Sequence, residues 1–253
     1  MTQDNDSHLI VGRHPVAEAL SRHPQRVQEL LVGSGRISPA LKRLLDSARS
    51  AGVKIRRLDK ARLDSLAQGA THQGVAARLS VSAYASLGDI LDRVRSASER
   101  ALVVVADHIQ DPHNLGALIR SAAAAGAQGL ITPKDRACPL TPAVAKAAAG
   151  SLELLPVARV TNLATCLAEL KENSLWLLAA ATRGAPAPWE LDLDLPLALI
   201  VGSEHKGVSA GLMKICDLET SLPLAAGAES LNASVAAGAI LFEILRQRQT
   251  RKA

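Results

Sequence analysis

Apolar residues along the chain form short, nearly unbroken runs that are separated by polar stretches. Two such runs, ALVVVAD at 101–107 and LALIVG at 197–202, each end in a polar residue or a glycine. A run in which almost every position is apolar is typical of a strand that is buried on both faces of a parallel sheet. Further runs at 129–132, 175–182 and 218–224 predict more strands. We therefore expect an α/β fold.

Helix signals alternate with these strands. Asp111 and Pro112 precede HNLGALIRSAAAAG, and Gly126 closes that stretch. An acidic residue and a proline at the start, with a glycine after the end, are typical helix boundaries. The sequence also predicts a final helix over 231–249, and we expect the basic residues 246–252 to be frayed at the chain end.

The first part of the chain has shorter elements of the same two kinds. Its expected strands are 9–12, 27–33, 53–58 and 74–82, and its expected helices are 15–20, 39–52 and 59–67. This alternation predicts a compact α/β domain over 1–82. The polar stretch 83–100 is expected to be a connecting helix or linker, and 101–253 a second α/β domain.

Composition restricts the class of protein. Of 253 residues, 48% are hydrophobic and 21% charged, a balance typical of a globular chain. No apolar run reaches the ~20 residues that a bilayer span needs, and the N-terminus lacks the pattern of a signal peptide. We expect a soluble, cytoplasmic protein without a membrane partner. The three cysteines are far apart and form no CxxC pair, so no metal is expected.

Positive charge is concentrated in the first domain. The net charge of the chain is +5, whereas residues 1–80 carry a net +6 and residues 101–253 a net −1. Eight Lys and Arg residues against two Asp lie within 42–62. Clustered basic residues displace counterions from a phosphate backbone, which favours nucleic-acid binding. A solvated helix face with no partner explains the same counts equally well.

Several motifs are incomplete. Gly33-Ser34-Gly35 begins like a dinucleotide fingerprint, but Ser38 replaces its third glycine. Gly202 and Gly207 have the spacing of a P-loop without its lysine, so an NTPase is not supported. The four aromatic residues form no cluster on which bases could stack.

Three segments carry the candidate chemistry: 107–120, 199–209 and 222–238. Each follows a predicted strand end, where open α/β sheets bind ligands. Their polar candidates are Asn114, Arg120, Glu204, Ser230 and Asn232. Read one by one, the same residues also fit a surface salt bridge, a tight turn and ordinary helix caps.

Together these segments closely resemble the three motifs of the SpoU (TrmH-like) branch of the SPOUT RNA methyltransferases. The matching stretches are NLGALIR, IVGSEHKG and LPLAAGAESLNASVAAG. In the first domain, VGRHPVAEAL (11–20) and THQGV (71–75) resemble the L30e-like substrate-binding domain of some members. One position departs from the pattern, since Ala233 stands where relatives commonly have valine.

The resemblance implies a parallel-sheet SPOUT domain with a deep trefoil knot, preceded by a small L30e-like α/β domain. It implies S-adenosylmethionine as the methyl donor and S-adenosylhomocysteine as the product. The cofactor-binding positions that it implies are Gly202, Leu222 and Leu231. The catalytic positions that it implies are Asn114, Arg120, Glu204, Ser230 and Asn232.

The resemblance is strongest to bacterial enzymes that methylate a guanosine ribose 2′-hydroxyl in 23S rRNA. It implies 23S rRNA or a large-subunit precursor as the partner, and a homodimer. Arg120 would then stabilise the developing alkoxide, and Glu204 would orient Arg120 or relay the proton. Three alternatives stay open: a tRNA ribose methyltransferase, an rRNA adenosine methyltransferase that confers antibiotic resistance, and a non-catalytic RNA-binding or ribosome-assembly factor on this fold. A nucleotide oxidoreductase lacks its fingerprint.

Overall fold

The chain forms two compact α/β units in the computed structural model. The structure describes residues 8–35, 37–67, 69–80, 83–203, 206–225 and 230–250. One unit comprises the chain up to Ala83 with the short segment Pro139–Pro142, and the other comprises the remainder. Each unit is described by itself.

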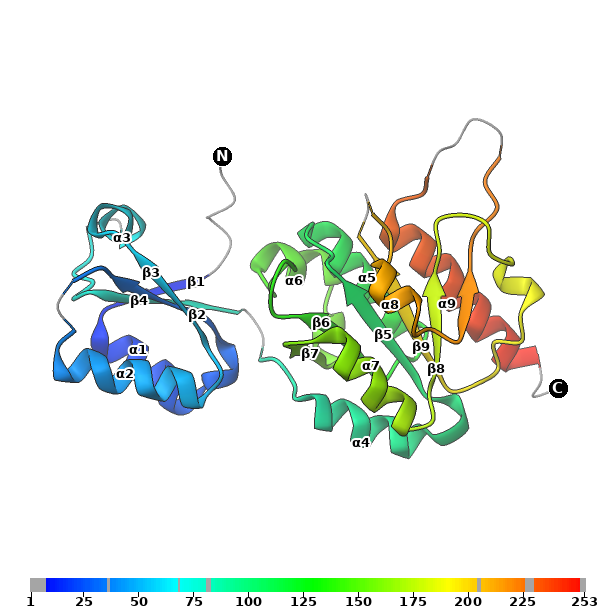
Figure 1. Cartoon of the computed structure of the whole chain (residues 1–253), viewed down its shortest axis with the longest axis horizontal. Coiled ribbons are helices and arrows are strands. Elements are labelled where there is room, and N and C mark those ends of the chain that lie inside the picture. Colours follow the sequence, from blue (N-terminus) through cyan, green and yellow to red (C-terminus); the bar gives the residue numbers. More distant parts are fainter. Residues whose placement is uncertain are drawn as a thin grey trace. The chain divides into compact units, whose positions relative to one another are not determined.

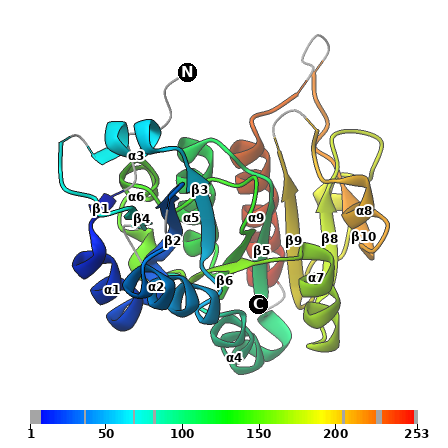
Figure 2. The same ribbon diagram turned by 60° about the vertical axis from the view of Figure 1, so that its left-hand side comes forward.

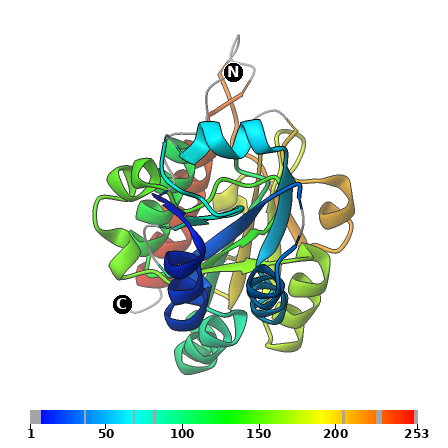
Figure 3. The ribbon, with the colours of Figure 1, turned by 90° about the vertical axis from the view of Figure 1, so that its left-hand side faces the viewer.

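The first unit is a four-stranded mixed sheet with helices on both faces. Its strands are β1 (His8–Val11), β2 (Val27–Gly33), β3 (Lys54–Leu58) and β4 (Val75–Leu79), in the order β1-β4-β2-β3. Only β2 and β3 are parallel. Helices α1 (Arg13–Arg22) and α2 (Pro39–Ser50) cover one face, and α3 (Lys60–Ala67) covers the other (Figure 3).

The alternating direction of the apolar side chains of β2 explains why helices pack on both faces of this sheet. Leu30 and Val32 pack in the core beneath α1 and α2, whereas Leu31 packs on the opposite face with residues of α3. Successive side chains of a strand point to opposite faces, so one apolar strand supplies both cores. The Ser38 hydroxyl accepts a hydrogen bond from the Leu41 amide at 3.2 Å and so caps α2.

The second unit is built on a six-stranded parallel sheet. Its strands are β5 (Leu102–Asp107), β6 (Gly129–Pro133), β7 (Val157–Val160), β8 (Trp176–Ala180), β9 (Leu197–Gly202) and β10 (Leu218–Thr220). Their order is β10-β8-β9-β5-β6-β7, and every neighbouring pair is parallel. This confirms the predicted α/β fold with a parallel sheet, and it places the carboxyl ends of all six strands at one edge.

Helices cover both faces of this sheet (Figures 1 and 2). On one face α5 (Pro112–Ala124) packs against α9 (Ala233–Thr250), with α6 (Pro142–Ala148) beside α5. On the other face lie α4 (Leu87–Ala97), α7 (Leu163–Glu172) and the short α8 (Ala210–Met213). In the described part of the chain, no helix combines the length and the apolar character that a membrane span requires.

The stretch 83–100, predicted as a connecting helix or linker, belongs largely to the second unit. It contains α4, whose Ile90, Leu91 and Val94 are buried in the core that α4 shares with α7 and the sheet. Because these three residues recur with helical spacing, they form one apolar face that the polar composition of the stretch conceals. The stretch therefore contains a helix, as one of the two expectations had it, and this helix packs in the hydrophobic core of the second unit.

The end of α9 also differs from its prediction. Arg248, expected within a frayed end, is only 6% exposed. Its guanidinium donates hydrogen bonds to the carbonyl oxygens of Arg100, Ala101 and Leu195 at 2.9, 3.2 and 2.6 Å. Burial lowers the pKa of Arg248, but these three acceptors hold its charge in place. The helix end is thus fastened beside the start of the central strand.

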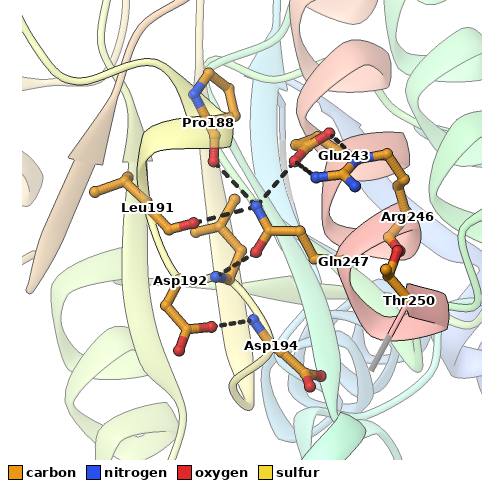
Figure 4. Close-up of polar contacts among 9 residues, drawn as sticks. Pro188, Leu191, Asp192, Asp194, Glu243, Arg246, Gln247 and Thr250 are labelled. Atoms are coloured by element: carbon orange, nitrogen blue, oxygen red, sulfur yellow. Dashed lines mark hydrogen bonds and ion pairs between the residues drawn. The ribbon is translucent and has the colours of Figure 1, made fainter. Parts of the chain in front are cut away.

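Gln247 forms a second set of hydrogen bonds between α9 and the segment before β9 (Figure 4). Its Nε2 donates to the carbonyl oxygens of Pro188 and Leu191 at 3.2 and 3.1 Å, and to Glu243 Oε1 at 2.9 Å. Its Oε1 accepts from the Leu193 amide at 2.8 Å. One side chain therefore satisfies three backbone groups of the segment that crosses from β8 to β9.

Candidate functional site

Two of the three candidate segments leave neighbouring strands at the carboxyl edge of the parallel sheet. Residues 108–111 follow β5, and 203–209 follow the adjacent strand β9. The third segment begins after β10, at the end of the sheet, and leads into α9, which returns to pack against α5 (Figure 2). The topology therefore brings segments far apart in sequence to one edge, where such sheets bind ligands.

The second segment folds back tightly on the end of β9. The Gly207 amide donates to the Ser203 carbonyl at 2.8 Å, and Gly207 has a φ of +63°. A Cβ atom on Gly202 would lie 1.8 Å from the Gly207 carbonyl carbon and 2.0 Å from the Val208 nitrogen. No side chain fits there, so the glycine is needed to close the turn.

Asp107 anchors this turn from the neighbouring strand. Its carboxylate is 1% exposed at the end of β5, and Oδ2 accepts a hydrogen bond from the Ser209 amide at 2.7 Å. The other oxygen, Oδ1, pairs with Nδ1 of His108. We assigned no role to Asp107 from the sequence, although a carboxylate that ends an otherwise apolar strand is a recognisable signal.

A pocket opens beside the turn, between the ends of β8, β9 and β10 and the start of α9. Four sequence-predicted residues line it: Gly202, Leu222, Ser230 and Leu231. Most of its other lining residues are small or apolar, such as Ala181 and Ala236. Its volume is about 80 Å³, smaller than the ~300–1,000 Å³ of typical small-molecule sites. A nucleoside-sized ligand must therefore part the side chains that line it.

Asn114 and Asn232 are brought together by the packing of α5 against α9. The Asn232 Nδ2 donates to Asn114 Oδ1 at 2.7 Å, and Asn114 is buried. Asn232 also caps α9, because its Oδ1 accepts from the amides of Ser234 and Val235 at 2.9 and 3.2 Å. The Ser234 hydroxyl lies 2.6 Å from the same oxygen and 3.4 Å from Asn114 Oδ1. Our sequence interpretation missed Ser234, which lies two residues after Asn232.

Arg120 lies on α5 but points elsewhere. It is exposed, and six residues separate it from Asn114, which turns it about 120° around the helix axis. The structure therefore places Arg120 on the same helix as Asn114 without bringing the two side chains together. Glu204 lies outside the described residues, as do 226–229 of the third segment.

Gly116 has a packing role. A Cβ there would lie 2.4 Å from the Ala147 Cβ and 2.8 Å from the Val144 carbonyl oxygen. The close neighbour suggested by this glycine is therefore helix α6 and not a ligand. The first segment contributes to the edge through Asp107 and Asn114.

Comparisons with known proteins agree with this architecture. The family model described as the SpoU rRNA Methylase family matches residues 101–242, and a model described as RNA 2'-O ribose methyltransferase substrate binding matches residues 9–85. The 23S rRNA (guanosine-2'-O-)-methyltransferase RlmB of Pseudomonas putida is 39% identical over 246 residues, which cover 96% of this chain and 98% of that protein.

Solved structures give the same result. The SpoU methyltransferase AviRb from Streptomyces viridochromogenes, solved in complex with AdoMet, superposes with a TM-score of 0.61 at 29% identity, covering 97% of this chain and 92% of AviRb. The TrmH/SpoU tRNA modifying enzyme of A. aeolicus superposes with a TM-score of 0.54 at 30% identity, covering 66% of this chain and 86% of that enzyme. The chain therefore belongs to the SpoU rRNA methylase family.

Proposed function

We propose that this protein transfers a methyl group from S-adenosylmethionine to a ribose 2′-hydroxyl of RNA, and that the target is a guanosine of 23S rRNA. The observation that carries the proposal is the pocket at the carboxyl edge, where Gly202, Leu222, Ser230 and Leu231 meet. The similarity to RlmB along nearly the whole chain supports the choice of 23S rRNA.

The pocket suits S-adenosylmethionine in its chemistry. Its walls combine apolar side chains, among them Leu222 and Leu231, with main-chain groups at the ends of β8 and β9. Apolar walls favour a nucleobase, and main-chain N–H and C=O groups can read its polar edge. Gly202 keeps the turn closed, so that its backbone forms one wall. When bound, S-adenosylmethionine supplies an electrophilic methyl group on a sulfonium.

The chain's own residues must position the ribose and assist loss of its proton. We assign the stabilisation of the developing alkoxide to Arg120, because arginine side chains stay protonated and offer several donors. We assign to Glu204, from its motif alone, the orientation of Arg120 or the relay of the proton. Arg120 is exposed on α5 whereas Asn114 is buried, so we propose that RNA or a partner subunit completes the site.

Asn114, Ser230 and Asn232 are proposed to position the ribose and its phosphate. The 2.7 Å hydrogen bond from Asn232 Nδ2 to Asn114 Oδ1 fixes the orientation of the two side-chain amides relative to each other. Ser230 lines the cofactor pocket two residues before Asn232, so it can reach a group placed between pocket and asparagine pair. Holding a nucleophile in one orientation lowers the entropic part of the barrier.

We propose that the first unit, taken as an L30e-like domain, binds the RNA substrate. Its three-layer arrangement around a mixed sheet and the match of a substrate-binding family model to residues 9–85 support this assignment. Its excess of basic residues suits phosphate contacts. The domain limits that we propose are 1–82 for this domain and 101–253 for the methyltransferase domain. Helix α4 lies between these limits in sequence and packs in the core of the second unit.

We further propose that the end of the chain forms the deep trefoil knot of the family. Support comes from two sets of bonds to the segment between β8 and β9. The Ser221 amide and the Thr220 hydroxyl donate to the Pro186 carbonyl, both at 3.0 Å, while Gln247 binds the Pro188 and Leu191 carbonyls. The chain before α9 and the end of α9 are therefore both fastened to this one segment.

A homodimer is also proposed. Val235 and Phe242 on α9 are 57% and 49% exposed, and seven residues, about two turns, separate them. They therefore lie on one apolar stripe of the helix whose start carries Asn232. A partner subunit that covers this stripe would adjoin the asparagine pair, in keeping with a site completed between subunits.

The A. aeolicus tRNA modifying enzyme supports a second candidate substrate, because its similarity to this chain includes the methyltransferase fold. Its superposition covers only 66% of this chain, so a third of the chain lacks a counterpart there. Because RlmB is similar over 96% of this chain, we favour rRNA over tRNA as the substrate. A non-catalytic RNA-binding factor is the remaining alternative.

The test is methyl transfer from radiolabelled S-adenosylmethionine to protein-free 23S rRNA, 16S rRNA and bulk tRNA, followed by mapping of the labelled nucleotide. We expect label on one 23S guanosine ribose.

We expect Arg120→Ala to lower turnover by about 100-fold or more, with cofactor affinity nearly intact, as when one oxyanion donor is removed. Label on tRNA would reassign the substrate, and loss of both labelling and cofactor binding in the wild type would favour the non-catalytic alternative.

A further inference from the structure

A second pocket lies on the other side of the turn that closes β9. It has a volume of about 460 Å³ and is lined by Asp107, His108, Gln110, Arg136, Lys206 and Ser209, together with Ser203 and Gly207 of the turn. We call it the basic pocket. Ser203 and Gly207 also line the proposed cofactor pocket, so the two pockets share one wall.

The basic pocket is assembled from loops that follow three adjacent strands. His108 and Gln110 follow β5, Arg136 follows β6, and Lys206 follows β9. The Gln110 Nε2 donates to the Arg136 carbonyl at 3.4 Å, and the Cys138 amide donates to the Ile109 carbonyl at 2.8 Å. These bonds join the first two loops and hold the Arg136 backbone beside the end of β5.

The charges in the pocket favour an anion. Arg136 and Lys206 are exposed cations, while the carboxylate in the lining, Asp107, is 1% exposed and engaged by the Ser209 amide and by His108. Asp107 is therefore buried and engaged by the protein, whereas the two cations in the lining are accessible to a ligand. A Lys and an Arg side chain in the lining of one pocket are a common arrangement for binding phosphate.

The backbone supports a functional role. His108 and Arg136 have φ values of +61° and +56°, a region that side-chain-bearing residues seldom adopt. Such conformations cost on the order of 1–3 kcal/mol each and cluster at ligand sites. Here two of them occur on adjacent loops and line the same pocket.

We propose that the basic pocket binds a backbone phosphate of the RNA substrate next to the methylated nucleotide. The proposal rests on the proposed function, since the shared wall places the phosphate beside the cofactor pocket. Arg136 and Lys206 are positioning residues: they hold the strand while the reacting ribose is presented to the methyl group. The anion alternative is the carboxylate of S-adenosylmethionine, and the experiment separates the two.

The test uses the full-length protein with Arg136→Gln, Lys206→Gln and the double substitution. Arg95→Gln is the matched control, because Arg95 is an exposed arginine of α4, engaged by Asp92 and Asn173 and outside the basic pocket. Binding of protein-free 23S rRNA is measured between about 50 and 300 mM KCl. S-adenosylmethionine affinity is measured by calorimetry, and kcat and KM for RNA by methyl transfer.

We expect each single substitution to weaken RNA binding about five- to tenfold and to reduce the slope of log K against log salt by about 0.7–0.9, as for one lost phosphate contact. KM for RNA should rise while kcat and cofactor affinity stay within about twofold, and the control should match the wild type. RNA affinity and salt slope unchanged in the double variant would overturn the proposal. Weaker S-adenosylmethionine binding with unchanged RNA binding would overturn it in favour of the cofactor carboxylate. Failure of the wild type to methylate any RNA would instead count against the proposed function, because the RNA-binding readout does not depend on turnover.

Discussion

Single residues at the site act mainly through the backbone that they permit. Gly202 is the clearest case, because the Gly207 and Val208 backbone occupies the place where its side chain would be. From the sequence, Gly202 was expected to lie in a loop around a small molecule. The sequence could not reveal that its close neighbour is the backbone of Gly207 and Val208. Gly116, which gave the same signal, packs against α6. A glycine shows that something approaches closely, but its identity depends on contacts that are distant in sequence.

Replacing Gly202 by alanine should open the turn. The added Cβ would lie 1.8 Å from a backbone atom that cannot move without breaking the Gly207–Ser203 hydrogen bond. We expect S-adenosylmethionine affinity to fall at least tenfold, on the scale of a misplaced pocket wall, as measured by calorimetry. Gly211→Ala is the control, since a Cβ there meets no atom within 4 Å. Equal cofactor affinity in the two variants would show that the turn does not shape the pocket.

The asparagine pair shows how far spacing alone can predict a site. Asn114 and Asn232 were both candidates, yet 118 residues separate them, and only the packing of α5 against α9 brings them within 2.7 Å. Nothing in the local sequence predicts that contact. Ser234 was missed for the same reason: on its own it reads as an ordinary residue of the first turn of a helix.

At the scale of elements, the strands buried on both faces were the most predictable. β5 and β9 are wholly buried, and their sequences are continuous apolar runs. The region around β7 was not predicted, because β7 is a short strand at the sheet edge whose last two residues are only half buried. α7 was also missed, although its buried residues Leu163, Cys166, Leu167 and Leu170 have helical spacing. That signal was present in the sequence.

The attachment of α9 to the chain before β9 can be tested through Gln247. Gln247→Ala leaves the Pro188 and Leu191 carbonyls and the Leu193 amide without this partner. We expect a loss of about 2 kcal/mol in the free energy of unfolding, since groups left unsatisfied in a partly buried place cost ~1–3 kcal/mol. Denaturant unfolding followed by circular dichroism measures this. Gln249→Ala, an exposed position two residues further on, should change stability little; an equally small loss for Gln247→Ala would contradict the attachment.

At the scale of the whole molecule, the excess of basic residues in the first unit has two possible physical roles. β3 is an edge strand of the first unit, and its Arg56 and Arg57 are exposed. Charged residues on an edge strand discourage pairing with other chains. The same residues, with Arg43 on α2, are also the basic surface that we propose binds RNA. The two roles are compatible, but only the second affects RNA affinity.

Neutralising this surface in the full-length protein separates the two roles. We expect Arg43→Gln, Arg56→Gln and Arg57→Gln together to reduce the salt slope of 23S rRNA binding by up to about 2, because each lost contact removes ~0.7. The matched control replaces three exposed basic residues of the second unit, Arg93, Arg95 and Lys214. If both triple variants show the same slope, the basic excess of the first unit is not a specific RNA surface.

The wall formed by Ser203 and Gly207 has a thermodynamic consequence. It borders two pockets, so if both bind their proposed ligands, a ligand that shifts the wall on one side changes the free energy of binding on the other. Linkage makes this effect reciprocal. If S-adenosylmethionine changes the affinity for RNA by some factor, RNA changes the affinity for S-adenosylmethionine by the same factor. The turn can close only because Gly202 has no side chain. This one position would thereby determine whether the two ligands bind independently or cooperatively.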